Sequence, residues 1–76
     1  MSDAKLRWRK FSPIDRDFPI YELVDGEVVI LDVTRGEDHS LEIAFHEGAA
    51  GRVLELGAIE RLIAEVKILL AREEPT

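Results

Sequence analysis

The two histidines are the first residues of this chain to consider for metal binding or proton transfer. His39 and His46 stand among carboxylates, including Glu42, and this combination binds metals or moves protons in many proteins. Residues 40–46 alternate apolar and polar side chains as a strand does, which places Glu42 and His46 on one face about 13 Å apart, at about 3.3 Å per residue. His39 and His46 then point to opposite faces. We therefore expect loop or surface histidines, with no metal site and no cofactor.

The other polar candidates do not form a catalytic set. Asp32 follows an apolar run on the same face as Val28 and Ile30. We expect it to end the apolar patch or to pair with an arginine such as Arg35 or Arg52, rather than to act as a general acid. The three serines lack a nucleophile elbow, and the absence of cysteine removes thiolate chemistry and disulfide frameworks. We expect the protein not to be an enzyme.

One short segment has the composition of a nucleic-acid or membrane-surface contact. Residues 7–11 read Arg-Trp-Arg-Lys-Phe, and such cations and rings can stack on bases or lie at anionic lipid. Burial of the rings with the cations reaching solvent gives the same composition. The charge distribution disfavours nucleic acid: residues 1–18 carry five basic and three acidic groups, whereas residues 19–76 carry five and thirteen, for a total of −6. An acidic body repels phosphate.

The clearest element in the sequence is a C-terminal helix. Its apolar residues recur at helical spacing within an arc of about 140°, and its charged residues lie outside that arc. These apolar residues are Ala58, Ile59, Leu62, Ile63, Val66, Leu69 and Leu70. We predict a helix over residues 57–73, with Gly57 as its N-cap and Glu60 at the capping-box position. Ile68 falls on the charged, solvent-facing side.

The preceding residues have the pattern of strands joined by turns. Residues 20–24 and 27–33 flank Asp25-Gly26, a pair suited to a tight hairpin turn. A further strand is expected over residues 41–45, and residues 52–56 are short enough for an edge strand. The pattern predicts an α+β fold, in which an antiparallel meander of three or four strands has the C-terminal helix packed on one face. Residues 1–18 are predicted to form an irregular or partly extended N-terminal arm, partly packed on a single domain of residues 19–76.

The second predicted strand is apolar on both faces. Val28 and Ile30 point one way, and the odd-numbered residues of 29–33 point the other. One helix covers one face. The second face therefore needs the N-terminal arm with Trp8 and Phe11, another copy of the chain, or a different protein. A chain of 76 residues buries only about 60% of its unfolded surface, so such cover matters for stability.

These observations favour a small non-catalytic protein-interaction module. It is either a homodimer or an accessory protein that binds a basic partner, as antitoxin and toxin-immunity proteins of similar size and charge do. The alternative is a nucleic-acid-binding protein that uses the basic and aromatic arm. The residues expected at the interface are Trp8, Phe11, Val28, Ile30 and Ile68. No apolar run approaches the roughly 20 residues of a membrane span, and no secretory signal pattern is present, so we expect a cytoplasmic protein without membrane contact.

Overall fold

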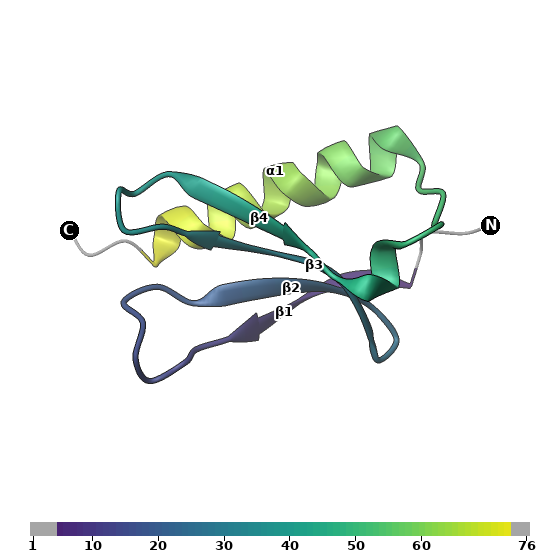
Figure 1. The fold of residues 1–76 in the computed structure, drawn as a ribbon. Coiled ribbons are helices and arrows are strands. Elements are labelled where there is room, and N and C mark those ends of the chain that lie inside the picture. The colour runs from purple at the N-terminus through teal and green to yellow at the C-terminus, as the bar shows by residue number, and fades with distance from the viewer. Residues whose placement is uncertain (1–4, 74–76) are drawn as a thin grey trace.

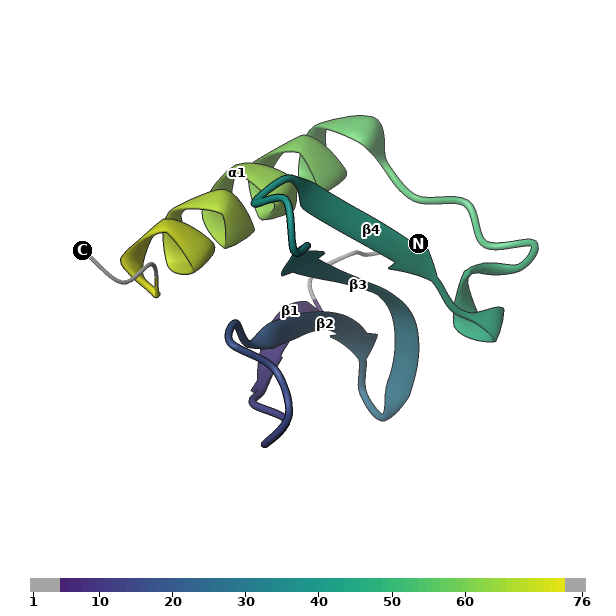
Figure 2. The same ribbon diagram turned by 60° about the vertical axis from the view of Figure 1, so that its left-hand side comes forward.

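The computed structural model describes residues 5–73 as a four-stranded sheet with one α-helix across it (Figures 1 and 2). The strands are antiparallel throughout, and their order in the sheet is β1-β2-β3-β4. The elements are β1 (Leu6–Phe11), β2 (Ile20–Asp25), β3 (Val28–Arg35), β4 (Leu41–Phe45), the short 3₁₀ helix η1 (Glu47–Ala49) and α1 (Leu56–Arg72). The predicted α+β meander with a C-terminal helix on one face is confirmed.

The N-terminal segment differs from the expected arm, because residues 6–11 are a strand of the sheet. β1 pairs with β2 from Leu6 opposite Asp25 to Phe11 opposite Ile20. Leu6 and Trp8 alternate with arginines, which is a strand pattern. Lys10 ends this alternation after four residues, which is too short for the period to identify a strand. The fourth strand thus comes from the beginning of the chain. Residues 52–55 form an extended connection outside the sheet, so the edge strand considered over 52–56 is not present.

Helix α1 begins and ends one residue earlier than predicted. Its N-cap is Glu55, whose side-chain Oε2 accepts a hydrogen bond from the backbone N–H of Ala58 at 3.1 Å. The prediction that Gly57 caps the helix is wrong, because a glycine has no side chain to accept that bond, whereas the Glu55 carboxylate folds over Gly57 to do so. The amphipathic pattern is confirmed: Val66 and Leu70 are fully buried and Ile68 is 57% exposed.

The core lies between α1 and the face of the sheet that it covers, which we call the inner face. Its buried members on the sheet come from β2 and β3, and those on the helix lie one turn apart. They are Tyr21, Leu23, Ile30, Leu31, Val33, Val66 and Leu70. Trp8 of β1 packs against this cluster at its edge, and β4 contributes no buried residue.

The second apolar side of β3 is covered by the loop that follows β4. The pairing shifts from Leu23 opposite Leu31 to Val24 opposite Val29, so Ile30 is the extra residue of a β-bulge. Ile30 is buried with the inner core, and Val24, which pairs with Val29 on the second side, is fully buried as well. η1 lies against this part of β3 so closely that a Cβ on Gly48 would overlap the Val29 carbonyl oxygen. This loop therefore covers the second side of β3, which was expected to be covered by the N-terminal arm, by another copy of the chain or by a different protein.

Candidate functional site

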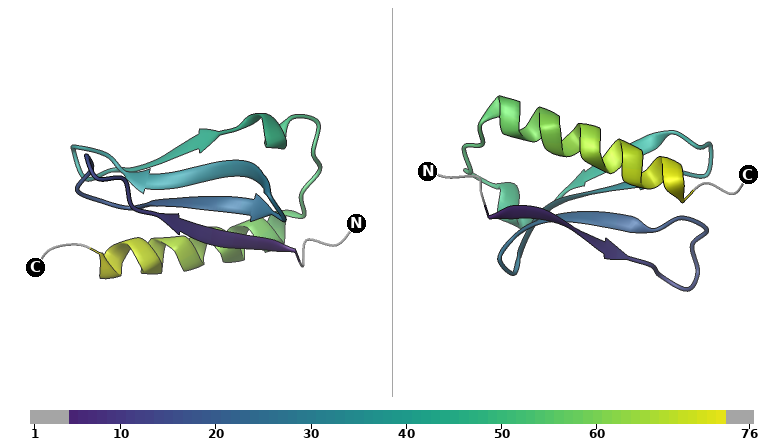
Figure 3. Two further views of the ribbon diagram at one scale, coloured as in Figure 1. Left: turned by 90° about the horizontal axis from the view of Figure 1, so that it is seen from below. Right: turned by 180° about the vertical axis from the view of Figure 1, so that it is seen from behind.

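Strand β4 is the part of the sheet that the chain leaves uncovered. It forms one edge of the sheet (Figure 3), and all five of its residues are exposed. Leu41, Ile43 and Phe45 are 38%, 47% and 71% exposed although the register places them on the inner face, with Ile43 opposite the buried Val33. Side chains at such positions normally belong to the core, so their exposure marks a candidate binding surface.

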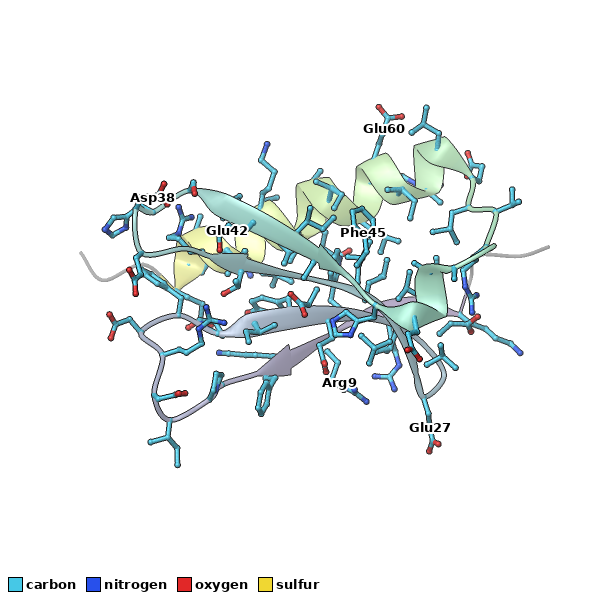
Figure 4. The ribbon with its side chains drawn as sticks, in the orientation of Figure 1. Arg9, Glu27, Asp38, Glu42, Phe45 and Glu60 are labelled. Atoms are coloured by element: carbon cyan, nitrogen blue, oxygen red, sulfur yellow. The ribbon has the colours of Figure 1, made fainter. Side chains whose placement is uncertain are left out.

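An apolar groove separates β4 from the helix. α1 lies against β1 and β3, and beside β4 it leaves a groove of about 420 Å³. The groove walls come from three elements: Val33 of β3, Leu41, Glu42 and Ile43 of β4, and Ile63, Val66 and Lys67 of α1. Glu42 and Phe45 both project from β4 (Figure 4). We call the inner side of β4 together with this groove the β4–α1 surface.

Two more exposed apolar side chains lie on the connection that leads from β4 into α1. Val53 is 84% exposed and Leu56, the first residue of the helix, is 72% exposed. Of the nine large hydrophobic residues that are exposed within residues 5–73, five belong to β4 and this connection. The apolar surface of the chain is thus concentrated in residues 41–56.

The opposite, outer face of the sheet is polar and internally paired. Arg9 binds Glu22, with 2.9 Å between Nη2 and Oε1, and His46 Nε2 lies 2.7 Å from Asp32 Oδ2. The strand pairing brings His46 from the end of β4 beside Asp32. Arg52, one of the two arginines expected to pair with Asp32, binds Asp25 instead. The Arg9–Glu22 and His46–Asp32 pairs each join side chains from neighbouring strands across the outer face.

Arg52 serves the loop rather than Asp32. Its Nη1 lies 2.7 Å from Asp25 Oδ2 in the β2–β3 turn, and its Nε donates to the Gly48 carbonyl at 3.1 Å. One side chain therefore fixes the loop after β4 to the hairpin turn next to it, and this keeps η1 over β3.

Five residues were predicted to form the interface, and the structure does not bring them together. Trp8 is engaged inside the chain, since its Nε1–H donates to the Leu62 carbonyl of α1 at 2.9 Å, and Ile30 is buried in the core. Phe11 lies on the outer side of the other edge strand, 54% exposed. Val28 is 47% exposed beside Gly48, and Ile68 lies on the solvent-facing side of α1. These positions belong to different surfaces.

The sequence reasoning missed the β4–α1 surface although a signal was present. Leu41, Ile43 and Phe45 alternate with polar or small residues in the last strand before the helix, a pattern typical of a strand with one buried face. In a meander closed by one helix, the final strand is an edge. An apolar row on an edge strand is the signal that points to a partner.

A small polar cluster joins the end of α1 to β1 and β2. Glu73 Oε1 accepts from Lys10 Nζ at 2.6 Å and lies 3.5 Å from the Tyr21 hydroxyl. The hydrogen bond to Glu73 raises the pKa of Lys10. Burial, the largest cause, raises the pKa of Tyr21. The cluster joins the end of α1 to two neighbouring strands of the sheet.

The histidines are not organised as a metal site. His39 occupies a turn with φ of 68°, and its ring meets the edge of Phe18 at 5.9 Å between centroids. Within residues 5–73 no group of three or more His, Cys, Asp or Glu side chains is placed to hold a metal ion. In the same residues no helix is long and apolar enough to cross a membrane.

Comparison with known proteins adds no family to this description. No protein-family model matches the chain, and neither a curated protein nor a solved structure matches it at a significant level. The fold and the β4–α1 surface are therefore the basis for a functional proposal.

Proposed function

We propose that this protein is a non-catalytic protein-interaction module that works as a homodimer through its β4–α1 surface. The single observation that carries the proposal is the row of Leu41, Ile43 and Phe45, which has the register of a core but lies open beside an apolar groove. A second copy supplies the same apolar row in return. Identical, self-complementary patches related by a two-fold axis are the commonest arrangement of soluble oligomers.

The apolar row is large enough to matter energetically. Full burial of a Leu, Ile or Phe side chain contributes about 1.5–3 kcal/mol, and scaling by their exposure gives roughly 3–4 kcal/mol for the three residues of one chain. Two chains contribute roughly 7 kcal/mol. Association costs about 4–15 kcal/mol in lost freedom, so this burial offsets the lower part of that range and requires additional contacts between the chains.

Charge distinguishes self-association from binding of a basic protein. Each chain carries a net charge of −6, so two copies repel, whereas a basic partner is attracted. The row itself is uncharged, and added salt screens the repulsion over a Debye length of about 8 Å at 0.15 M. Homodimerisation therefore strengthens as salt is added, and binding of a basic partner weakens.

The test is the solution mass of the full chain by light scattering over a hundredfold dilution, at low and at high salt. We expect a dimer that dissociates on dilution and persists to lower concentration at high salt. A chain that stays monomeric at high concentration and high salt would overturn the proposal. A purified basic protein that binds the monomer more tightly at low salt would support the other kind of partner.

Two phenylalanines on opposite edge strands provide a matched pair of variants. Phe45→Ser removes the most exposed side chain of the β4–α1 surface, and Phe11→Ser makes the same change on the outer side of β1. We expect Phe45→Ser to weaken the dimer at least tenfold and Phe11→Ser to leave it unchanged. The reverse result would place the interface at β1. Because both side chains are largely exposed, neither change should unfold the chain.

A further inference from the structure

We propose that the two copies join edge to edge, with β4 pairing antiparallel to β4 of the second copy about Ile43, so that one eight-stranded sheet runs through the dimer. This inference rests on the proposed homodimer and adds its geometry. It follows from the direction of the backbone groups on β4, from the charges of the two sheet edges, and from the residues that the pairing brings opposite each other.

The backbone groups of alternate β4 residues point away from the sheet. The hydrogen bonds His46 N to Ile30 O, 2.9 Å, and Gly36 N to Ser40 O, 2.8 Å, show that the even-numbered residues bond to β3. In an antiparallel ladder the residues between them direct both N–H and C=O to the other side. Leu41, Ile43 and Phe45 therefore present six backbone groups along the open edge. A strand of another chain can pair with all six.

The two edges of the sheet differ in how they are protected. β1 carries Arg7, Arg9 and Lys10, and cations of this kind discourage edge pairing. β4 carries the single charge of Glu42, has no proline or lysine, and pairs with β3 without a bulge. It is the unprotected edge. Two β1 edges would repel, so the contact that closes a symmetric dimer is β4 with β4.

The register follows from counting the outward groups. With Ile43 opposite Ile43 of the second copy, Leu41 lies opposite Phe45, and all six outward groups on each chain find partners. Glu42 then faces Ala44, so no like charges meet directly. In the neighbouring register, with Ala44 opposite Ala44, Leu41 reaches into the η1 segment and two groups on each chain lose their partners. The first register is therefore favoured.

The same pairing closes the apolar row. A two-fold axis perpendicular to the sheet keeps both helices on the same side, so the inner faces form one continuous surface. The Ile43 side chains meet on the axis, with Leu41 against Phe45 on either side of them. The backbone hydrogen bonds between the two β4 strands add to the free energy that burial of the apolar row contributes.

Cysteine cross-linking tests this register, because the chain has no cysteine of its own. Glu42→Cys and Ala44→Cys are made separately, and the two proteins are mixed and oxidised. In the proposed register these positions face each other as a non-hydrogen-bonded pair with Cα atoms about 4.5 Å apart, within the range of a disulfide. We expect a mixed disulfide dimer as the main product, and little cross-linking when either variant is oxidised alone.

The other outcomes separate the register from the dimer itself. Efficient cross-linking of Ala44→Cys alone would overturn the register in favour of the one with Ala44 on the axis. A dimer by light scattering that gives no disulfide in the mixture would overturn edge pairing and leave the proposed homodimer standing. A mass that grows without limit with concentration would show open-ended pairing of β4 with β1, and would also overturn the symmetric arrangement.

A backbone variant provides a second, independent test. Ile43→Pro removes the outward N–H at the axis, and proline is tolerated on an edge strand where that N–H faces solvent. Ile43→Val keeps the N–H and nearly the same side chain. We expect the proline variant to remain folded by circular dichroism and to dimerise at least tenfold more weakly, while the valine variant dimerises like the parent chain. Equal dimerisation of the two would refute backbone pairing at Ile43.

Discussion

Trp8 fixes strand β1 to helix α1, and replacing it tests whether the N-terminal segment is part of the fold. Trp8→Phe keeps an aromatic ring on the inner face but removes the Nε1–H that donates to the Leu62 carbonyl. A net hydrogen bond contributes about 1 kcal/mol. The smaller ring buries roughly 40 Å² less apolar surface, another 1 kcal/mol at about 25 cal/mol per Å². We expect a loss of about 2 kcal/mol in the free energy of unfolding.

The measurement is urea denaturation followed by far-ultraviolet circular dichroism, since the variant lacks the only tryptophan. For a domain of this size about 2 kcal/mol corresponds to a fall in melting temperature of roughly 8–16 °C, a second readout. All proteins are compared at one concentration, because the proposed dimerisation would stabilise the folded state by mass action.

Phe11→Leu is the control, because Phe11 lies on the outer side of the same strand and is 54% exposed. An exposed substitution of this kind should change stability by less than about 0.5 kcal/mol. If Trp8→Phe costs no more than Phe11→Leu, the contact between β1 and α1 does not stabilise the fold and the reasoning is wrong.

Two further predictions concern the loop after β4 and the only tyrosine. Gly48→Ala forces a Cβ against the Val29 carbonyl and should lower the free energy of unfolding, measured by thermal denaturation, by about 1–3 kcal/mol. Gly51→Asn, at an uncrowded position with φ of 69°, is the control and should lower it by less than about 1 kcal/mol. Equal losses would contradict the close packing of η1. Burial raises the pKa of Tyr21, so its absorbance titration should have a midpoint above that in concentrated urea, near 10. The corresponding stability is present below about pH 10 and is lost as the pH rises through the folded-state pKa; a native midpoint at or below the urea value would refute this.

The sequence was sufficient for the elements with strong local patterns. The Asp25-Gly26 turn and the apolar arc of α1 identified the central hairpin and the helix, and Gly26 has the positive φ of 63° that such a turn requires. β1 was missed because its alternation lasts four residues and its pairing depends on β2, whose paired residues lie 9 to 19 positions away along the chain. The sequence of β1 alone therefore has only a weak strand pattern.

The candidate surface was less predictable because exposure is a property of the assembled chain. The alternation over residues 41–45 predicts which side chains share a face, but only the placement of α1 decides which strands it covers. At Ile30 the assembled chain buries a residue that the sequence predicted to be at an interface. The β-bulge allows this residue to be buried by the chain itself.

The contact between Trp8 and Leu62 has a consequence for synthesis on the ribosome. The four strands are neighbours in both sequence and sheet, so each hairpin can form as soon as its second strand emerges, while α1 is made after all four strands. At about 5–20 residues per second, the 17 residues of the helix take roughly 1–3 s, during which the inner face of the nascent sheet has no cover. The open β4 edge lies beside that face, so neighbouring ribosomes on one message would hold two unfinished chains with matching edges close together. A dimer formed in this way would begin to assemble before either chain is complete.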